Sequence, residues 1–569
     1  MPTSTDPLIT PFTTHDLVIS VSVTVACLLL ALLQFKAAEK LFRGIERAGA
    51  AFARHRSLAI GALFCTVLAV RVAVLRLLPV PIPGIHDEFS YLLMGDTFAH
   101  GRWTNPTHPL WRSFETFHVN WLPTYSSMYP PAQGVVLAIG ELLGNAWIGV
   151  LLSDAAMCAA ILWMLQAWLP ARWAWLGAIL AALKLGIASY WMNSYWGGAV
   201  GAIGGALVLG ALPRIGRHAR VRDALLLALG VALLANSRPY EGALFCLPVA
   251  VWLVLWVAGA MRPAIPRAAR LRRVLAPIAV VLLLTAAAMG FYNWRVTGQA
   301  WLFPYTLNLR TYVTAPIFLW QHAKPEMHYN NAQFEEFYND WARSEFQRDW
   351  ASIRAVSLLK WVRLRAVFFW PAAVMLLPGF VCVFRDKRMR LLLAVLFIAA
   401  PGLFLVVWSN PHYAAPLTCV LFALLVQSLR HLRTWKLFAR PVGATLARAV
   451  VILLAVQTIR DVHARRCDEI TWTCGGDSSR EDILQRLTKL PGKQLVMVRY
   501  DADHNIHDEW VFNGAEIDSA KVLWARELDA AQNAALLEYF NDRTVWLVQP
   551  DEDNLELVPY AEGASDAEP

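Results

Sequence analysis

Two adjacent carboxylates, Asp87 and Glu88, follow His86 in the stretch PIPGIHDEFSYLLMGDTFAHG, directly after a hydrophobic run of membrane-spanning length. A carboxylate accepts a proton from a hydroxyl group that attacks an electrophile, provided that it lies within hydrogen-bond reach. Two carboxylates and a histidine also suit a divalent metal ion, with Glu88 and His86 as candidate ligands. The structural alternative is that Asp87 caps a helix and that Glu88 complements its dipole. The residue types leave all three roles open.

Polar side chains at the ends of other apolar segments are candidates to complete a site. Arg238 in NSRPYEG needs a counter-ion, and a lipid phosphate is one while Glu241, three residues later, is the other. The candidates for binding a phosphate are Arg238, Tyr240, Arg295, His412 and Tyr413. The candidates for contacts with the rest of a substrate are His86, Tyr129, Asn193, Tyr195, Trp196 and Glu241. Aromatic residues at such positions are also typical interfacial anchors.

The elements that must position these residues are membrane helices. Hydrophobic residues make up 57% of the 569 residues and charged residues 16%, which is typical of a polytopic membrane protein. The net charge of +9 lies in short basic clusters between apolar runs, so we expect no nucleic-acid partner. About twelve spans are predicted, near 17–35, 58–79, 148–169, 174–190, 196–213, 223–237, 241–260, 274–291, 365–384, 390–408, 412–429 and 442–459, with 132–146 as a further short or re-entrant helix.

The linkers between these spans alternate in charge. One set is strongly basic, as cytoplasmic loops are, and the other carries aromatic, acidic and histidine residues. This alternation predicts that both termini and the stretch beginning at His86 lie on the outer side of the membrane. From Glu88 onward, the spacing of Phe89, Leu92, Leu93 and Thr97 predicts an amphipathic helix that lies along the interface and ends at His100–Gly101.

The domain organisation follows from these segments. Residues 1–57 form an extra N-terminal span with a basic cytoplasmic segment, and residues 58–460 form the main membrane domain with outer loops 80–131 and 291–357. The second loop is too long for a passive connector and is either a lid or acceptor platform, or a set of interfacial helices. Residues 461–569 have the composition of a small periplasmic α/β domain, which is a structural cap, a partner-docking domain or a functional part.

Within this last domain, a capping box from Ser479 to Asp482 predicts a helix, and NAALLEYF predicts another. Strands are predicted at KQLVMVRY, EWVFNG, KVLWAREL and TVWLVQP. The domain has no glycine-rich phosphate loop. Cys467 and Cys474 are expected outside the membrane, where they either pair in a short disulfide or stay free.

The motifs HDEFSYL, YPP and HYAAP, in this order along the chain, resemble those of the GT-C membrane glycosyltransferases, in particular the protein O-mannosyltransferase and lipid A aminoarabinose transferase types. The resemblance covers the topology of residues 58–430, and SYWGGAVGAIGGALVLGALPR and NSRPYEG look like an uncharacterised bacterial branch. It implies an all-α polytopic fold in a bacterial inner membrane with the site on the periplasmic side. It also implies a polyprenyl-phosphate sugar donor and a hydroxyl acceptor on a glycan, lipid or protein.

The resemblance further implies residue roles. Asp87 would be the general base in an inverting transfer, and Glu88 would orient the acceptor or, with His86, bind a divalent metal ion. Arg238 would face the leaving lipid phosphate, with Tyr240, Arg295 and His412 as further candidates. The sequence departs from better-known members because no lysine stands beside the acidic pair.

Two other classes of function stay open on the sequence. A lipid or glycan transporter requires ionisable residues within the membrane, for which Asp154 and Lys184 are the candidates. A non-catalytic envelope assembly protein would account for the C-terminal domain. Substitution of Asp87 by asparagine separates these classes, because only an enzyme should lose turnover.

Overall fold

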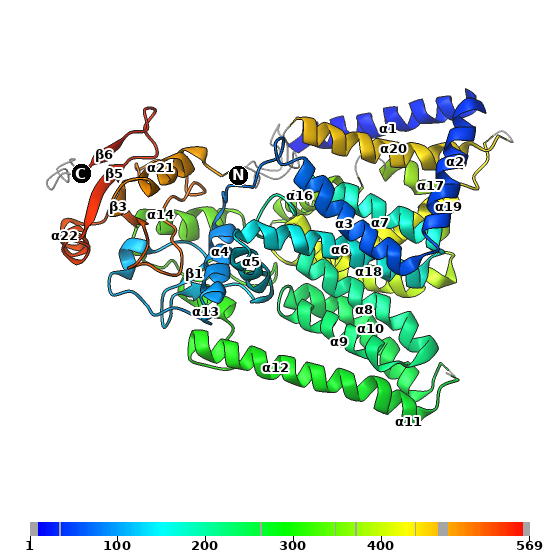
Figure 1. Cartoon of the computed structure of the whole chain (residues 1–569), viewed down its shortest axis with the longest axis horizontal. Coiled ribbons are helices and arrows are strands. Elements are labelled where there is room, and N and C mark those ends of the chain that lie inside the picture. Colours follow the sequence, from blue (N-terminus) through cyan, green and yellow to red (C-terminus); the bar gives the residue numbers. More distant parts are fainter. Residues whose placement is uncertain are drawn as a thin grey trace.

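The computed structural model describes residues 9–33, 36–261, 264–346, 349–369, 373–437, 440–464 and 476–560. Figure 1 shows a larger part made of long helices and, at one end of the molecule, a small part built on a β-sheet. The long helices are α1 (Ile9–Leu33), α3 (Arg56–Ala73), α6 (Ala146–Trp168), α7 (Ala171–Leu185), α8 (Ala199–His218), α9 (Val221–Ala235), α10 (Pro239–Ala258), α12 (Ala276–Thr297), α16 (Trp350–Phe368), α17 (Ala373–Val383), α18 (Arg390–Leu405), α19 (Thr418–Leu432) and α20 (Val442–His463). Short helical segments lead directly into three of them: α11 (Arg267–Arg270) and η2 (Leu271–Leu275) into α12, η4 (Lys387–Met389) into α18, and η5 (Pro411–Leu417) into α19.

The predicted membrane fold with a small α/β part is confirmed, although fewer helices than predicted have full membrane length. Each of the twelve predicted ranges overlaps an apolar helix. In the described part of the chain, 8 helical segments are long and apolar enough to cross a membrane. Of the other four, α7 and α9 have 15 residues each and α17 has 11. Helix α1 has 25 residues, but its apolar stretch is limited to Val21–Leu32. The short helix predicted near 132–146 is α5 (Ala132–Leu142).

Small residues set the packing at the centre of the larger part. Helix α8 contains Gly201 and Gly205, and a Cβ atom on Gly205 would lie 2.2 Å from the carbonyl oxygen of Pro416. A side chain at this position would therefore displace η5. Membrane helices commonly use such small residues to bring backbones close together. The glycine-rich stretch GAVGAIGG thus seats η5, which carries His412 and Tyr413, against α8.

The first outer loop folds around α4 (His86–Ala99), η1 (Trp111–Phe114), β1 (Val119–Asn120) and β2 (Ser126–Ser127). The predicted cap is wrong, because the residue before the first helical turn is Ile85 and Asp87 lies inside that turn. The predicted amphipathic helix is not observed, because no residue of α4 is exposed. Helix α4 packs against α5 on one side and the C-terminal part on the other, so most of its side chains are buried.

The second outer loop folds onto the first. Its helices are α13 (Pro304–Thr311), α14 (Ala332–Glu335), η3 (Glu336–Trp341) and α15 (Ala342–Ser344), followed by α16. Phe117 of the first loop stacks on Phe334 at 4.4 Å between ring centroids and contacts Phe337 at 4.5 Å. These contacts make the two outer loops one packed layer.

The C-terminal part contains α21 (Ser478–Thr488), β3 (Lys493–Val498), β4 (Val522–Arg526), α22 (Ala530–Tyr539), β5 (Arg543–Val548) and β6 (Leu557–Pro559). The strand order is β4-β3-β5-β6, with β3 parallel to β4 and β5, and β6 antiparallel to β5. The predicted capping box is wrong, since Asp477 caps α21 by accepting from the Ser479 backbone N–H. EWVFNG is not a strand of this sheet. Cys467 and Cys474 lie outside the described residues.

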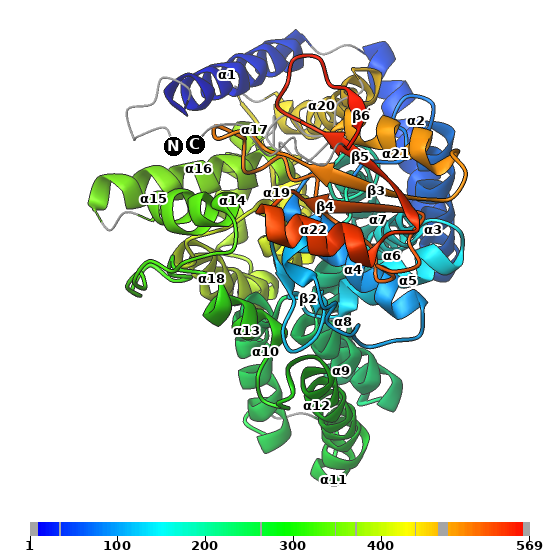
Figure 2. The same ribbon diagram turned by 90° about the vertical axis from the view of Figure 1, so that its left-hand side faces the viewer.

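EWVFNG and its neighbours instead dock the C-terminal part onto the first outer loop, at the end of the molecule that faces the viewer in Figure 2. Phe512 stacks on Phe89 of α4 with 3.7 Å between ring centroids, and the Ala515 backbone N–H donates to Asp96 at 2.6 Å. A strand would pair its backbone with a neighbour, whereas this segment uses its backbone and rings to cover α4.

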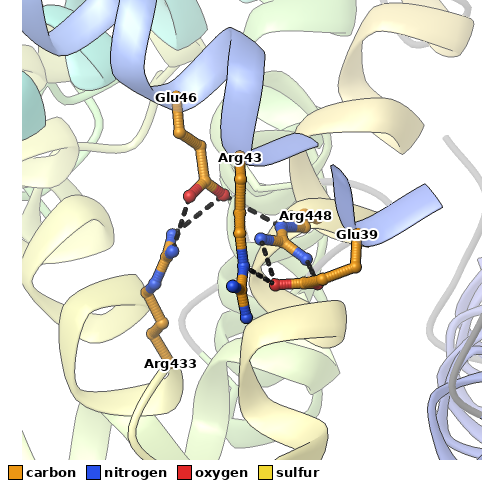
Figure 3. A network of polar contacts seen from close by, with 5 residues as sticks. All are labelled: Glu39, Arg43, Glu46, Arg433 and Arg448. Carbon is orange, nitrogen blue, oxygen red and sulfur yellow. Dashed lines mark hydrogen bonds and ion pairs between the residues drawn. The ribbon is translucent and has the colours of Figure 1, made fainter. Parts of the chain in front are cut away.

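Ion pairs attach the N-terminal segment to the end of α19 and to α20. Helix α1 lies along α20 (Figure 1), and α2 (Lys36–Phe52) follows it. Figure 3 shows Glu46 of α2 held by Arg433 and Arg448, with Arg448 also bound to Glu39. The Arg448 side chain is 10% exposed, so this network is partly shielded from water. It fixes α2 to α19 and α20.

Candidate active site

Asp87 and Tyr129 form the centre of the site. Tyr129 follows β2 in the YPP motif, and its phenol donates a short hydrogen bond to the Asp87 carboxylate. Burial and the charge of Asp87 raise the pKa of Tyr129 well above its usual value, so the phenol keeps its proton and acts as a donor. The Tyr129 ring stacks on Tyr91 with 4.4 Å between centroids. Because Tyr91 lies one helical turn after Asp87, both side chains share one face of α4.

Arg238 and Tyr413 form the second half of the site. Arg238 is the residue before the first turn of α10, and its guanidinium lies 4.4 Å from the centroid of the Tyr413 ring on η5. Glu241 acts on Arg238 through its charge, but the two side chains form no ion pair. The structural alternative, in which Glu241 neutralises Arg238 directly, is therefore not what the structure shows. The Arg238 guanidinium instead packs on the Tyr413 ring.

A small cavity connects the two halves. Tyr91 and Arg238 both contribute to its wall, so the ring stacked on Tyr129 and the guanidinium face one space. The full lining consists of Tyr91, Pro130, Gln133, Gly197, Gly198, Val200, Gly201, Ser237, Arg238 and Ala415. The glycines of the SYWGG turn and of α8 leave room there, since a Cβ on Gly201 would lie 3.5 Å from the Arg238 side chain. Asp87 does not line this cavity, but it lies next to the wall through Tyr129, which stacks on Tyr91. The cavity volume of about 10 Å³ has room for roughly one water molecule.

Glu88 has a different role from the one predicted. Its two carboxylate oxygens accept hydrogen bonds from the backbone N–H groups of Gly84 at 2.8 Å and Tyr195 at 2.9 Å. Burial raises the pKa of Glu88 to about 7, against the opposing effect of these donors. The phenol of Tyr195 in turn donates to the Pro81 carbonyl at 2.9 Å. Glu88 and Tyr195 therefore position the start of α4.

Asn193 is also structural rather than substrate-binding. Its amide donates to the carbonyls of Ile187 and Ser189 and accepts from Arg71 at 2.8 Å, so its polar atoms are used within the turn. The same turn holds Tyr190, which hydrogen-bonds to Nδ1 of His412 at 2.9 Å and accepts from the His412 backbone N–H. These bonds fix the orientation of His412, which is not among the residues that line the cavity beside Arg238.

Trp196 is buried beside His412, with 4.4 Å between the ring centroids. Its Nε1–H has no acceptor among the described residues. Trp196 precedes Gly197 and Gly198, which line the cavity. It therefore supports the wall of the site from behind.

Two predicted phosphate ligands lie elsewhere. The Tyr240 phenol donates to the Gly402 carbonyl on α18 at 3.3 Å, and its ring packs on Phe318 at 5.1 Å. Arg295 is exposed on α12, where its nearest ring is that of Trp294 at 5.9 Å. Neither residue reaches the cavity that Arg238 lines, so both predictions are wrong for this structure.

His86 is buried in an aromatic cluster. Its ring stacks on Phe117 at 4.2 Å and lies 5.9 Å from His118 and 6.2 Å from His507 of the C-terminal part. Burial lowers the pKa of His86 well below its usual value, so it is neutral. His86 and Glu88 are two positions apart on a helix and do not face each other. Among the residues that the structure describes, no group of three or more His, Cys, Asp or Glu side chains is arranged to hold a metal ion.

Sequence reasoning missed three residues. Tyr91 lies four positions after Asp87, and this helical spacing was the available signal. Tyr305, beside Tyr129 at 6.4 Å, follows the proline that begins α13. Gln133 lines the cavity and donates to the Tyr195 carbonyl at 2.8 Å. No local pattern marked Tyr305 or Gln133.

No family model matches the chain, and no curated protein matches its sequence. Among solved structures, the chain is similar to the oligosaccharyltransferase of Archaeoglobus fulgidus, at 12% identity and a TM-score of 0.44, over 85% of this chain and 68% of that chain. It is similar to ArnT of Cupriavidus metallidurans at 16% identity and a TM-score of 0.47, over 86% of this chain and 93% of that chain.

A third similar structure is the arabinofuranosyltransferase AftD from mycobacteria, at 17% identity and a TM-score of 0.44, over 88% of this chain and 36% of that chain. All three are GT-C glycosyltransferases, the family that the motifs of this sequence resemble. At these identities, and with TM-scores below 0.5, the similarity assigns this chain neither a donor nor an acceptor.

Proposed function

We propose that this protein is an inverting membrane glycosyltransferase of the GT-C type, which moves a sugar from a polyprenyl-phosphate donor to a hydroxyl acceptor. The observation that carries the proposal is that Arg238 lines a small cavity together with Tyr91, which stacks on Tyr129, the residue that holds Asp87. Among the described residues, Arg238 forms no ion pair with a carboxylate. A base and a cation close to one another are what such a transfer needs.

In the proposed reaction, Asp87 takes the proton from the acceptor hydroxyl as its oxygen bonds to the anomeric carbon. The bond from that carbon to the phosphate oxygen breaks on the opposite face, so the configuration inverts. The lipid phosphate leaves with the electron pair, and Arg238 stabilises the charge that grows on it. Tyr129 holds the Asp87 carboxylate in one orientation and, by remaining protonated, does not compete for the acceptor proton.

The donor class follows from the position of Arg238. Arg238 immediately precedes α10, which is one of the 8 described segments that are long and apolar enough to cross a membrane. A lipid phosphate lies at the level where such helices end, whereas the polyprenyl chain stays in the hydrocarbon. We place this end of the bundle on the periplasmic side of a bacterial inner membrane, because the opposite linkers carry the basic clusters.

One observation favours the transporter alternative. Asp154, in the middle of α6, is fully buried, and neither of its carboxylate oxygens has a hydrogen-bond partner in the described part of the chain. Arg71 of α3 is the opposite charge that acts on it. Buried carboxylates within spans are typical of proton-coupled transport. Transport in reconstituted vesicles that is lost in Asp154→Asn, without any sugar transfer, would support this alternative.

The experiment that tests the proposal uses the full chain in nanodiscs with a panel of polyprenyl-phosphate sugars. One donor should raise the thermal unfolding midpoint of the wild type and of Arg295→Ala, an exposed-arginine control, but not that of Arg238→Ala. Asp87→Asn should bind that donor and fail to release polyprenyl phosphate, measured by mass spectrometry. Donor stabilisation that is unchanged in Arg238→Ala, or full turnover by Asp87→Asn, would contradict the proposal.

A further inference from the structure

A second cavity lies between the two outer loops. It is lined by Trp111, Glu115, Asn120, Trp121, Leu122, Thr311, Tyr312, His328, Tyr329 and Asn330. Its volume of about 160 Å³ is far larger than the roughly 10–15 Å³ that one water molecule occupies. The first loop supplies half of the wall and the second loop the other half, so the cavity exists because the two loops pack on each other.

The floor of this cavity carries polar groups that are not fully used. Glu115 is 1% exposed, and its two oxygens accept one hydrogen bond each, from the Tyr312 phenol and the Asn330 amide, both at 3.0 Å. A carboxylate has about four acceptor sites, so further donors can bind it. The Nε1–H of Trp121 is buried and has no acceptor among the described residues. Buried polar groups of this kind are costly unless a partner binds them.

Much of the remaining wall is aromatic, and Leu122, Thr311 and His328 also line it. Trp111 and Trp121 lie nearly parallel, with 6.4 Å between centroids and 23° between planes, and Tyr312 and Tyr329 complete the surface. The faces of aromatic rings carry partial negative charge and attract weakly positive C–H groups. The lining includes one acid and no lysine or arginine, which disfavours an anionic ligand. A flat ring with C–H faces and hydroxyl edges, namely a neutral sugar, meets these requirements.

Two elements that line the cavity also lead to the proposed reaction site. The second residue of α13, Tyr305, lies beside Tyr129, and its last residue, Thr311, lies in the cavity wall, about 9 Å further along at 1.5 Å per residue. On the other side, Asn120 of β1 lies in the wall, and β1 pairs with β2, which leads directly to Tyr129. A saccharide chain of a few residues can therefore reach from one site to the other.

We infer that the cavity walled by Trp111, Glu115 and Trp121 binds a neutral sugar residue of the acceptor, away from the residue that receives the transferred sugar. The inference rests on the proposed function for the role of the bound sugar as acceptor, although the binding itself does not. It makes the acceptor a glycan, either free or attached to a lipid, rather than a single hydroxyl on a protein side chain.

The test uses the full chain in nanodiscs and three variants. Trp111→Ala removes an aromatic wall, Glu115→Gln keeps the shape of the side chain and removes its charge, and Trp301→Ala, at a tryptophan that is 93% exposed and outside the cavity, is the control. Binding of neutral di- to tetrasaccharides is measured by saturation-transfer NMR, with and without a polyprenyl anchor. Donor hydrolysis to water is measured separately, without any acceptor.

Trp111→Ala and Glu115→Gln should each weaken saccharide binding at least tenfold, while their donor hydrolysis and thermal midpoints match those of Trp301→Ala. Binding only of anchored saccharides would identify the acceptor as a lipid-linked glycan, and equal binding of both would identify a free glycan. Active donor hydrolysis with no saccharide binding, or equal binding in all variants, would overturn the inference and leave the proposed function standing. Saccharide binding without any donor turnover would overturn the proposed function and leave the sugar site standing.

Discussion

Removing the phenol of Tyr129 is the sharpest test of the proposed base. In Tyr129→Phe, the ring that stacks on Tyr91 remains and only the hydroxyl that donates to Asp87 is lost. A hydrogen bond to a charged group contributes about 1.5–3 kcal/mol, and each 1.36 kcal/mol changes a rate about tenfold. If the whole bond serves to orient the carboxylate, kcat should fall by about 10- to 150-fold, with a small change in the apparent affinity for the donor.

The assay is a double-mutant cycle on release of polyprenyl phosphate. Asp87→Asn alone should lower kcat by about 10²–10⁴-fold, the usual contribution of a positioned general base. Adding Tyr129→Phe to Asp87→Asn should cost little more, because the hydroxyl has then lost the group that it positions. Tyr560→Phe is the matched control, since it removes a phenol-to-carboxylate bond of 2.9 Å to Glu527 in the C-terminal part.

Two results would refute this reasoning. If Tyr129→Phe retained the wild-type kcat, the hydrogen bond to Asp87 would have no catalytic role. If Tyr129→Phe lowered kcat by the same factor with and without Asp87, the two residues would act independently, and Tyr129 would contact the substrate rather than the base. A loss of thermal stability in Tyr129→Phe that is absent from Tyr560→Phe would indicate a packing defect instead.

Three further perturbations have expected outcomes. Burial raises the folded-state pKa of Glu88 to about 7, so its contribution to stability is present at low pH. This contribution is lost as the pH rises from about 4.5 through 7. Glu88→Gln should therefore flatten the fall of the thermal midpoint over that range. Gly205→Ala should weaken donor binding, measured by the donor-induced thermal shift, because its Cβ meets the Pro416 carbonyl and displaces η5; an unchanged shift would argue against this packing. Arg448→Met should lower the free energy of unfolding by about 1 kcal/mol at low salt and by less at high salt. Arg43→Met, at an arginine that is 63% exposed, should change the free energy of unfolding little. Equal effects of the two substitutions would show that the network in Figure 3 does not hold α2.

Much of the fold could be predicted because membrane spans are a property of local composition. A segment such as 148–169 must bury its backbone polar groups in its own hydrogen bonds, so its apolar length predicts a helix without knowledge of its neighbours. Strands β3, β4 and β5 were also predicted from local sequence, but EWVFNG is not a strand. Its Trp510 and Val511 are buried in the core of the C-terminal part, whereas Phe512 stacks on Phe89 of α4. Composition predicted that this segment is buried but not against which surface.

The sequence by itself determined that Asp87 and Arg238 lie at the ends of helices, where a charged side chain requires a partner. Only the tertiary structure decided that Arg238 shares a cavity with Tyr91 while Arg295 stays on the exposed face of α12, and that backbone N–H groups occupy both oxygens of Glu88. The physical reason is that hydropathy acts residue by residue along the chain. The convergence of side chains depends on how closely helices approach, which here is set by contacts such as that of Gly205 with Pro416, 211 positions later in the sequence.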